Sequence, residues 1–122
     1  MDSGQEPVAT IVEAMFTEAE AGRLVLRMSA INVREVFYFV RKQFSEELAE
    51  QWRTASATLP VMIEVPTAAD IWDAAMLKSE WPISYADAFA AAMAFKYNCP
   101  VITGDPEFRK VKGLRIEWVG PN

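Results

Sequence analysis

The chain has 122 residues, 52% of them hydrophobic and 24% charged, which fits one globular domain over residues 1–122 and excludes a disordered chain. Its 17 acidic and 12 basic residues give a net charge of −5, which argues against a general polyanion binder. The lack of His excludes Ser-His-Asp catalysis and imidazole metal ligands, and the single Cys99 predicts a reducing, cytoplasmic setting.

The first half of the chain alternates predicted helices with short strands. The predicted elements are a helix at 6–22, a strand at 24–28, a helix at 29–44, a helix at 45–58 and a strand at 61–65. Gly22 is expected to end the first helix, and Ser45 is placed to cap the third. No apolar run approaches the roughly 20 residues that cross a bilayer, so no membrane contact is expected.

The second half continues the alternation. Thr67 is expected to cap a helix that ends before Trp81, and Ser84 to cap a helix over 85–97. Strands are predicted at 101–103 and 114–118, with a turn at 104–106. The helix at 85–97 is apolar on nearly every side, so it should lie buried against a sheet. Strands separated by helices predict an α/β fold with three α/β/α layers around a central parallel sheet.

Asp and Glu carboxylates are the side chains of this sequence that are best able to support catalysis. Asp105 follows the strand 101–103, Asp87 lies in the first turn of the buried helix, and Glu35 lies in the first turns after the strand 24–28. Sites in parallel α/β sheets form beyond the carboxyl ends of strands, so these side chains are predicted near one sheet edge. Carboxylates gathered there repel one another unless a cation binds, and oxygen ligands select Mg²⁺ or Mn²⁺ over zinc.

Each carboxylate also has a structural interpretation. Asp87 stands three residues after Ser84, the interval of a capping box, so it could serve only to stabilise the start of its helix. Asp105 in Gly-Asp-Pro could be a turn residue. Glu35 could be a solvated helix carboxylate. The aromatic residues at helical spacing are assigned to the core; they are Phe37, Phe44, Trp52, Trp72, Phe89 and Phe95.

Three stretches together resemble PIN-domain proteins, and most closely the VapC-type toxins of prokaryotic toxin–antitoxin pairs. The stretches are SAINVREVFY (29–38), ISYADAFAAA (83–92) and VITGDPEF (101–108), and the resemblance extends over about residues 4–119. It implies a metal-dependent ribonuclease, in which an acidic cluster holds Mg²⁺ or Mn²⁺ ions that activate water and stabilise charge on the phosphate.

The resemblance also implies roles for individual residues and partners. Glu35, Asp87 and Asp105 match acidic metal positions, and Thr103 matches a polar site residue. Ser84 and Arg109 are candidate secondary contacts, with a helix cap and a solvated surface Arg as their structural interpretations. The implied partners are an RNA substrate, a small antitoxin and a second copy in a homodimer. The stripe that could dock an antitoxin helix or a second subunit comprises Phe37, Tyr38, Val40, Arg41 and Phe44.

The start of the chain departs from the family pattern. PIN domains usually open with a buried strand that ends in an Asp, followed by a short helix. Here GQEP (4–7) directly follows Met1-Asp2-Ser3, so the first strand and helix are missing or altered, and Asp2 is expected in a loop. The alternative function is therefore a non-catalytic PIN-like module that binds RNA or protein and has an incomplete metal site.

Overall fold

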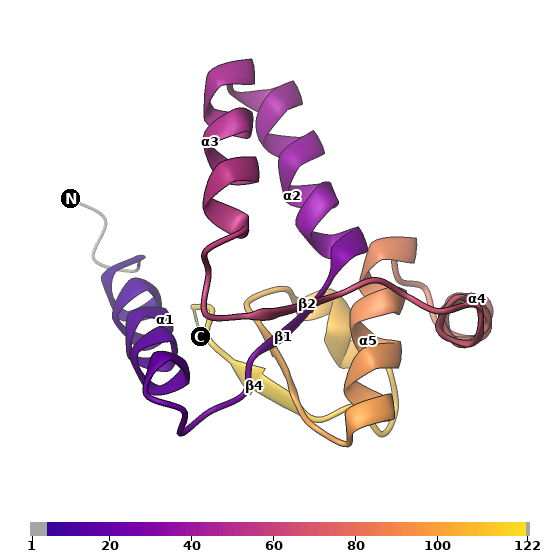
Figure 1. Cartoon of the computed structure of the whole chain (residues 1–122). Helices are drawn as coiled ribbons and strands as arrows, with labels where there is room; N and C mark the ends of the chain where they lie inside the picture. The colour runs from indigo at the N-terminus through magenta and orange to yellow at the C-terminus, as the bar shows by residue number, and fades with distance from the viewer. Residues whose placement is uncertain (1–4, 122) are drawn as a thin grey trace.

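The computed structural model describes residues 5–121, with side chains from Thr10 onward, so the predictions for Asp2 and its neighbours lie outside the described residues. The elements are α1 (Gln5–Glu20), β1 (Arg27–Ser29), α2 (Ala30–Gln43), α3 (Glu46–Ser56), β2 (Met62–Glu64), α4 (Ala68–Glu80), α5 (Tyr85–Tyr97), β3 (Val101–Thr103), the 3₁₀ helix η1 (Pro106–Lys110) and β4 (Ile116–Trp118). Figure 1 shows the strands between α1 on one side and α5 with α4 on the other, which is the layered α/β arrangement that the sequence predicts.

Local capping signals set the helix starts. Ser29, Ser45, Thr67 and Ser84 each accept a backbone N–H with their side-chain oxygen at the start of a helix. Such an interaction satisfies one of the free donors of the first turn. Thr67 and Asp70 complete a reciprocal capping box on α4. The predicted caps at Ser45, Thr67 and Ser84 are thus confirmed.

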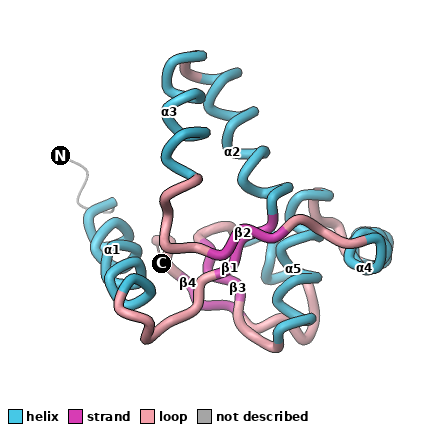
Figure 2. Tube along the Cα trace, viewed as in Figure 1, coloured by secondary structure: helices cyan, strands magenta, loops and turns pink. Residues whose placement is uncertain are grey.

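The strands form a smaller sheet than the sequence predicts. In the described residues β1 pairs with β2 and β3 pairs with β4, both in parallel, and these pairs make two separate two-stranded sheets (Figure 2). Each strand has three residues, because only the paired stretches of the predicted strands form ladders. The α/β class with parallel strands is confirmed, whereas the single central sheet is divided by a groove between β1 and β3.

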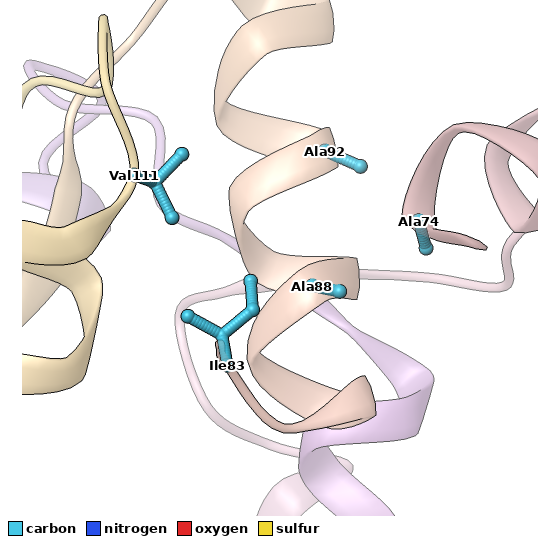
Figure 3. Packing of buried hydrophobic residues seen from close by; sticks show 5 residues of the cluster. All are labelled: Ala74, Ile83, Ala88, Ala92 and Val111. Atoms are coloured by element: carbon cyan, nitrogen blue, oxygen red, sulfur yellow. The ribbon is translucent and has the colours of Figure 1, made fainter. Parts of the chain in front are cut away.

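Small side chains allow α4 and α5 to pack closely. Ala74 of α4 and Ala88 of α5 are both completely buried, and Figure 3 shows Ala88 and Ala92 directed toward the helix that carries Ala74. Ile83 and Val111 complete this cluster, and Phe89 is partly buried against it. The buried core therefore rests on alanine contacts, which hold α5 firmly in place while burying little apolar area per residue.

The prediction of an aromatic core is only partly correct. Trp52 is half-buried, and its indole N–H donates to the Val33 carbonyl at 2.9 Å, which fastens α3 to α2. Phe44 and Trp72, in contrast, are 68% and 73% exposed, and Phe95 is also exposed. Helical spacing was the only basis for placing them inside, and it does not reveal whether another element covers that face.

No helix in the described part of the chain is long and apolar enough to cross a membrane.

A polar cluster joins β1, β2 and α5. The Arg27 Nη1 atom lies 3.2 Å from Glu64 Oε2 on the neighbouring strand, and the Arg27 guanidinium lies 4.0 Å from the centre of the Tyr97 ring. The Tyr97 hydroxyl donates to the other oxygen of Glu64. This hydrogen bond holds the proton on the phenol, so it raises the pKa of Tyr97.

Glu64→Gln is therefore expected to lower the pKa of Tyr97 toward the ordinary tyrosine value of about 10, because the charge that opposes phenolate formation is gone. Ultraviolet absorbance of tyrosinate, followed through an alkaline titration, measures the change. Glu80→Gln, at the exposed end of α4, is the control and should leave the titration unchanged. An unchanged titration in Glu64→Gln would contradict the contact between Tyr97 and Glu64.

Candidate metal and phosphate site

A groove between β1 and β3 gathers the residues predicted to carry function. It has a volume of about 820 Å³, and Glu35, Asp87, Thr103 and Asp105 all line it. Glu35 comes from α2, Asp87 from α5, and the other two from β3 and the loop that follows it. The structure therefore places all four on one groove, at the carboxyl ends of β1 and β3, where sites form in open α/β folds.

Glu35 lies on the second turn of α2, which Ser29 caps. Loss of hydration raises the pKa of the Glu35 carboxyl, and the negative charges of Asp87 and Asp105 raise it further. A carboxyl with a raised pKa binds a proton or a cation more readily, because either one removes the repulsion between like charges. Glu35 is thus electrostatically linked to the two other carboxylates.

Asp87 lies in the first turn of α5, and its backbone N–H donates to the Ser84 hydroxyl oxygen at 3.1 Å. Partial burial raises the pKa of the Asp87 carboxyl. Asp105 and Glu107 raise it further, while a hydrogen bond with Ser84 opposes them. A carboxylate that only stabilised its helix N-terminus would have a lowered pKa. The net rise indicates that its environment favours a bound positive charge.

Asp105 and Thr103 organise the loop after β3. The Asp105 N–H donates to Thr103 Oγ1 at 2.9 Å, and Asp105 Oδ1 accepts the Glu107 N–H at 2.9 Å. Asp105 is thereby the N-cap of η1, a 3₁₀ helix where the sequence predicted only a turn. The turn interpretation of Asp105 is correct for its local structure, and its Oδ2 atom makes no hydrogen bond within the described residues.

Asn32 is a groove residue that sequence reasoning did not place at the site. Its Nδ2 atom donates to the Ala86 carbonyl at 2.9 Å, which links α2 to the first turn of α5. Its Oδ1 atom is buried and has no hydrogen-bond partner among the described residues. A buried unpaired acceptor is uncommon and indicates a missing donor, water or ion. The signal in the sequence was the three-residue interval to Glu35, which puts both on one helix face.

The donor set fits a hard divalent cation in its chemistry. Carboxylate and amide oxygens line the groove, and these are the ligands that Mg²⁺ and Mn²⁺ prefer. Among the side chains described from Thr10 onward, however, no three from His, Cys, Asp or Glu come close enough together to hold one ion. Mg²⁺ usually keeps several waters and takes only one or two protein carboxylates beside substrate phosphates, so these residues can still hold it.

The two candidate secondary contacts have structural roles in the described chain. Ser84 caps α5, as its structural interpretation predicted. The Arg109 guanidinium lies 4.0 Å from the centre of the Trp118 ring, where a cation and an aromatic face attract each other. Contact of Arg109 with a phosphate stays a prediction.

The loop that carries Asp105 depends on a close backbone contact. A Cβ atom added to Gly120 would lie 2.8 Å from the Gly104 Cα atom and 2.9 Å from the Trp118 ring. Gly120→Ala is therefore expected to destabilise the fold by about 1–3 kcal/mol, since backbone atoms must move apart. Chemical denaturation measures the loss. Ala57→Gly, at the exposed end of α3, is the control and should cost less stability than Gly120→Ala. Gly22→Ala is a poor control, because Gly22 has a positive φ that strains any other residue.

Comparison with known proteins agrees with this architecture. The PIN domain family matches residues 5–114, and none of the curated proteins matches the chain. Among solved structures, the chain is similar to one in the crystal structure of VapBC2 from Rickettsia felis bound to a DNA fragment from their promoter. That match has 19% identity and a TM-score of 0.67, and it covers 87% of this chain and 82% of the other. Because the family match spans most of the sequence, this chain belongs to the PIN domain family.

Proposed function

We propose that this protein is a metal-dependent ribonuclease that cuts RNA phosphodiester bonds, and that it is the toxin of a toxin–antitoxin pair. Family membership supports a nuclease, since PIN domains are generally nucleases. One observation carries the finer proposal: Glu35, Asp87 and Asp105 line one groove, where partial burial and the nearby carboxylates raise the pKa of Glu35 and of Asp87. A cation bound among such carboxylates would stabilise their charged form.

The residues have distinct tasks in this mechanism. Glu35 and Asp87 would hold Mg²⁺ or Mn²⁺, and Asp105 lines the same groove. Such an ion, when bound, would lower the pKa of a water and offset the negative charge of the phosphate. Thr103 fixes the loop that presents Asp105, through the 2.9 Å hydrogen bond from the Asp105 N–H. Asn32 positions α2 against the first turn of α5, through the 2.9 Å hydrogen bond that its Nδ2 atom donates to the Ala86 carbonyl.

A non-catalytic PIN-like module that binds RNA or protein is the alternative function. It draws support from the carboxylates of residues 10–121, the range of described side chains, which do not converge into a cluster of three around one point. Such a module would bind nucleic acid or protein at the groove and leave RNA intact. The two functions therefore differ in whether Mn²⁺ produces cleavage.

The proposed partners are a small antitoxin and a second copy of the chain. The VapBC2 neighbour supports the antitoxin, because its structure contains a VapBC pair. The surface that we assign to partners is the exposed apolar side of the α2–α3 hairpin, which consists of Tyr38, Phe39, Phe44 and Leu48. Figure 1 shows this hairpin standing clear of the strands, and large exposed apolar patches are typical of interaction sites.

Incubation of the chain with mixed RNA and Mn²⁺ tests the enzyme. We expect cleavage that a chelator abolishes and that Glu35→Gln reduces by about tenfold or more, since changes around a metal site commonly cost that much. Glu47→Gln on the exposed side of α3 is the matched control and should cleave like the unaltered chain. Intact RNA at every Mn²⁺ concentration, with no calorimetric sign of Mn²⁺ binding, would leave the non-catalytic module as the function.

A further inference from the structure

The segment 109–115, with the sequence RKVKGLR, is the most basic stretch of the chain. It holds four of the 12 basic residues and none of the 17 acidic residues. It begins four residues after Asp105, the N-cap of η1, and it runs through the end of η1 to the start of β4. Because the chain as a whole is acidic, a surface that attracts a polyanion must be local, and this segment is where positive charge is in local excess.

Three cations of this segment have no acidic partner. Six basic residues of the described chain form ion pairs with Asp or Glu, and Lys110 is one of them, with its Nζ atom 3.0 Å from Glu107 Oε2. Arg109, Lys112 and Arg115 form no ion pair with the described residues, and all three are exposed. The positive charge that the fold leaves without a counter-charge is therefore concentrated here. The other basic residues without an ion pair in the described chain are dispersed: Arg34, Lys42 and Lys78.

Contacts with the fold hold the two arginines at opposite ends of β4. The Arg109 guanidinium lies 4.0 Å from the centre of the Trp118 ring, and Trp118 pairs with Thr103 at the carboxyl end of β3. Arg115 directly precedes β4, and its Nη2 atom donates to the carbonyl of Asn98, which ends α5. A guanidinium has five N–H donors, so these contacts leave donors for a phosphate. The segment thus extends from the end of β3 that leads to Asp105 to the opposite end.

An exposed aromatic side chain adjoins the middle of the segment. Phe95, near the end of α5, is 44% exposed. A Cβ atom placed on Gly113 would lie 3.9 Å from the Phe95 ring, so the ring lies against the turn that follows Lys112. Surfaces that bind single-stranded nucleic acid combine cations that follow the phosphates with aromatic faces on which bases stack. The combination of free cations and an exposed ring therefore favours an unpaired strand.

The charge of the neighbouring groove gives such a surface a task. An RNA that reaches the groove has phosphates on either side of the bond to be cut, and Glu35, Asp87 and Asp105 repel them. Cations outside the groove offset this repulsion only if they lie along the path of the strand. Segment 109–115 begins at η1, which Asp105 caps, so it adjoins the groove directly.

We propose that Arg109, Lys112 and Arg115 bind the phosphates of an unpaired RNA strand that extends out of the carboxylate groove, and that Phe95 stacks one of its bases. The choice of RNA rests on the proposed function, whereas the place of the site rests on the free cations and the exposed ring. These residues position the strand and do not touch the reacting phosphate. Their loss should therefore raise KM for RNA and leave kcat nearly unchanged.

Binding of a short, fluorescein-labelled single-stranded RNA in the presence of EDTA tests the cations without cleavage. Fluorescence anisotropy over a range of salt concentrations gives the affinity and its salt dependence. Lys112→Gln with Arg115→Gln should lower the slope of log affinity against log salt by about 1.4, since each phosphate contact with a single strand contributes about 0.7. Lys112→Gln alone breaks no ion pair of the described chain and should lower the slope by about half as much. The matched control, Lys42→Gln with Arg53→Gln, removes two charges from the exposed side of the α2–α3 hairpin and should leave the slope unchanged.

Phe95→Leu separates stacking from charge. It should weaken binding of the single-stranded RNA by about tenfold, a common loss when one base loses its aromatic partner, while the salt slope stays the same. Binding of the same RNA annealed into a duplex should not respond to Phe95→Leu, because its bases are stacked on one another. An equal loss with both RNAs would overturn the stacked, unpaired base.

The outcomes separate this inference from the proposed function. If Mn²⁺ produced no cleavage while Lys112→Gln with Arg115→Gln and Phe95→Leu still weakened binding, the nuclease would be contradicted and the RNA site would stand. An unchanged salt slope in the variant without Lys112 and Arg115 would overturn the RNA site even if the chain cleaves RNA. Polyglutamate that displaces the labelled RNA as well as unlabelled RNA does would also overturn it, and would assign the segment to an acidic protein partner.

Discussion

Asp87→Asn is expected to reduce Mn²⁺-dependent RNA cleavage by about a hundredfold or more. A bound metal ion supplies several kcal/mol of charge stabilisation in the transition state, and a loss of that size corresponds to such a factor. Asn keeps the size of the side chain and leaves the backbone N–H of residue 87 free to donate to Ser84, so α5 keeps its cap. The loss would therefore report on the carboxylate charge. Cleavage rates at saturating RNA, over a range of Mn²⁺ concentrations, measure it.

The same substitution should make the metal-free chain more stable near neutral pH. The pKa of the Asp87 carboxyl is higher in the folded chain than in the unfolded one, where it is about 4, because of partial burial and the nearby Asp105 and Glu107. Between these two pKa values the folded state binds more protons than the unfolded state, so stability falls as the pH rises through that window. Asn has no charge to desolvate. The free energy of unfolding of Asp87→Asn should therefore exceed that of the unaltered chain above the window, and this difference should be absent below about pH 3.

A matched control separates this effect from a general effect of lost charge. Asp73→Asn, on the exposed side of α4, removes the same charge far from the groove and should change neither cleavage nor the pH dependence of stability. Denaturant unfolding at several pH values measures both variants. If Asp87→Asn lowered stability at neutral pH while retaining cleavage, Asp87 would be a structural helix carboxylate, and the site would have to be sought elsewhere in the groove.

The local signals in the sequence determined much of the fold. Helix α5 and strand β3 were predicted residue for residue, because Ser84 starts the helix and Asn98, with a φ of 51°, ends it. The grouping of Glu35, Asp87 and Asp105 followed from chain topology alone, since carboxyl ends of parallel strands meet at one edge.

What the sequence left open depends on contacts between distant segments. The free acceptor of Asn32 arises from its bond to Ala86, 54 positions away, which no spacing rule predicts. The division of the sheet likewise depends on how far apart β1 and β3 lie. The exposed Phe44 and Trp72 resemble core residues in pattern, because periodicity marks an apolar face without showing what covers it.

Ala88→Leu and Ala90→Leu should have very different effects, although both lie in an alanine-rich helix that is apolar on nearly every side. Ala88 is completely buried against α4, where Ala74 is also completely buried, so a larger side chain must push the two helices apart (Figure 3). Overpacking of a core commonly costs up to about 3 kcal/mol. We expect a cost near that upper value for Ala88→Leu, because helix backbones cannot yield as a flexible side chain can.

Ala90 lies two positions further along α5 and lines the open groove, so Leu at this position can extend into free space. Its cost in stability should stay within about 1 kcal/mol, since Ala and Leu differ little in helix propensity. Thermal unfolding of both variants measures the difference, which should place the midpoint for Ala88→Leu roughly 10 °C below that for Ala90→Leu. Similar midpoints would mean that Ala90 packs as tightly as Ala88. The groove between β1 and β3 would then be closed in solution.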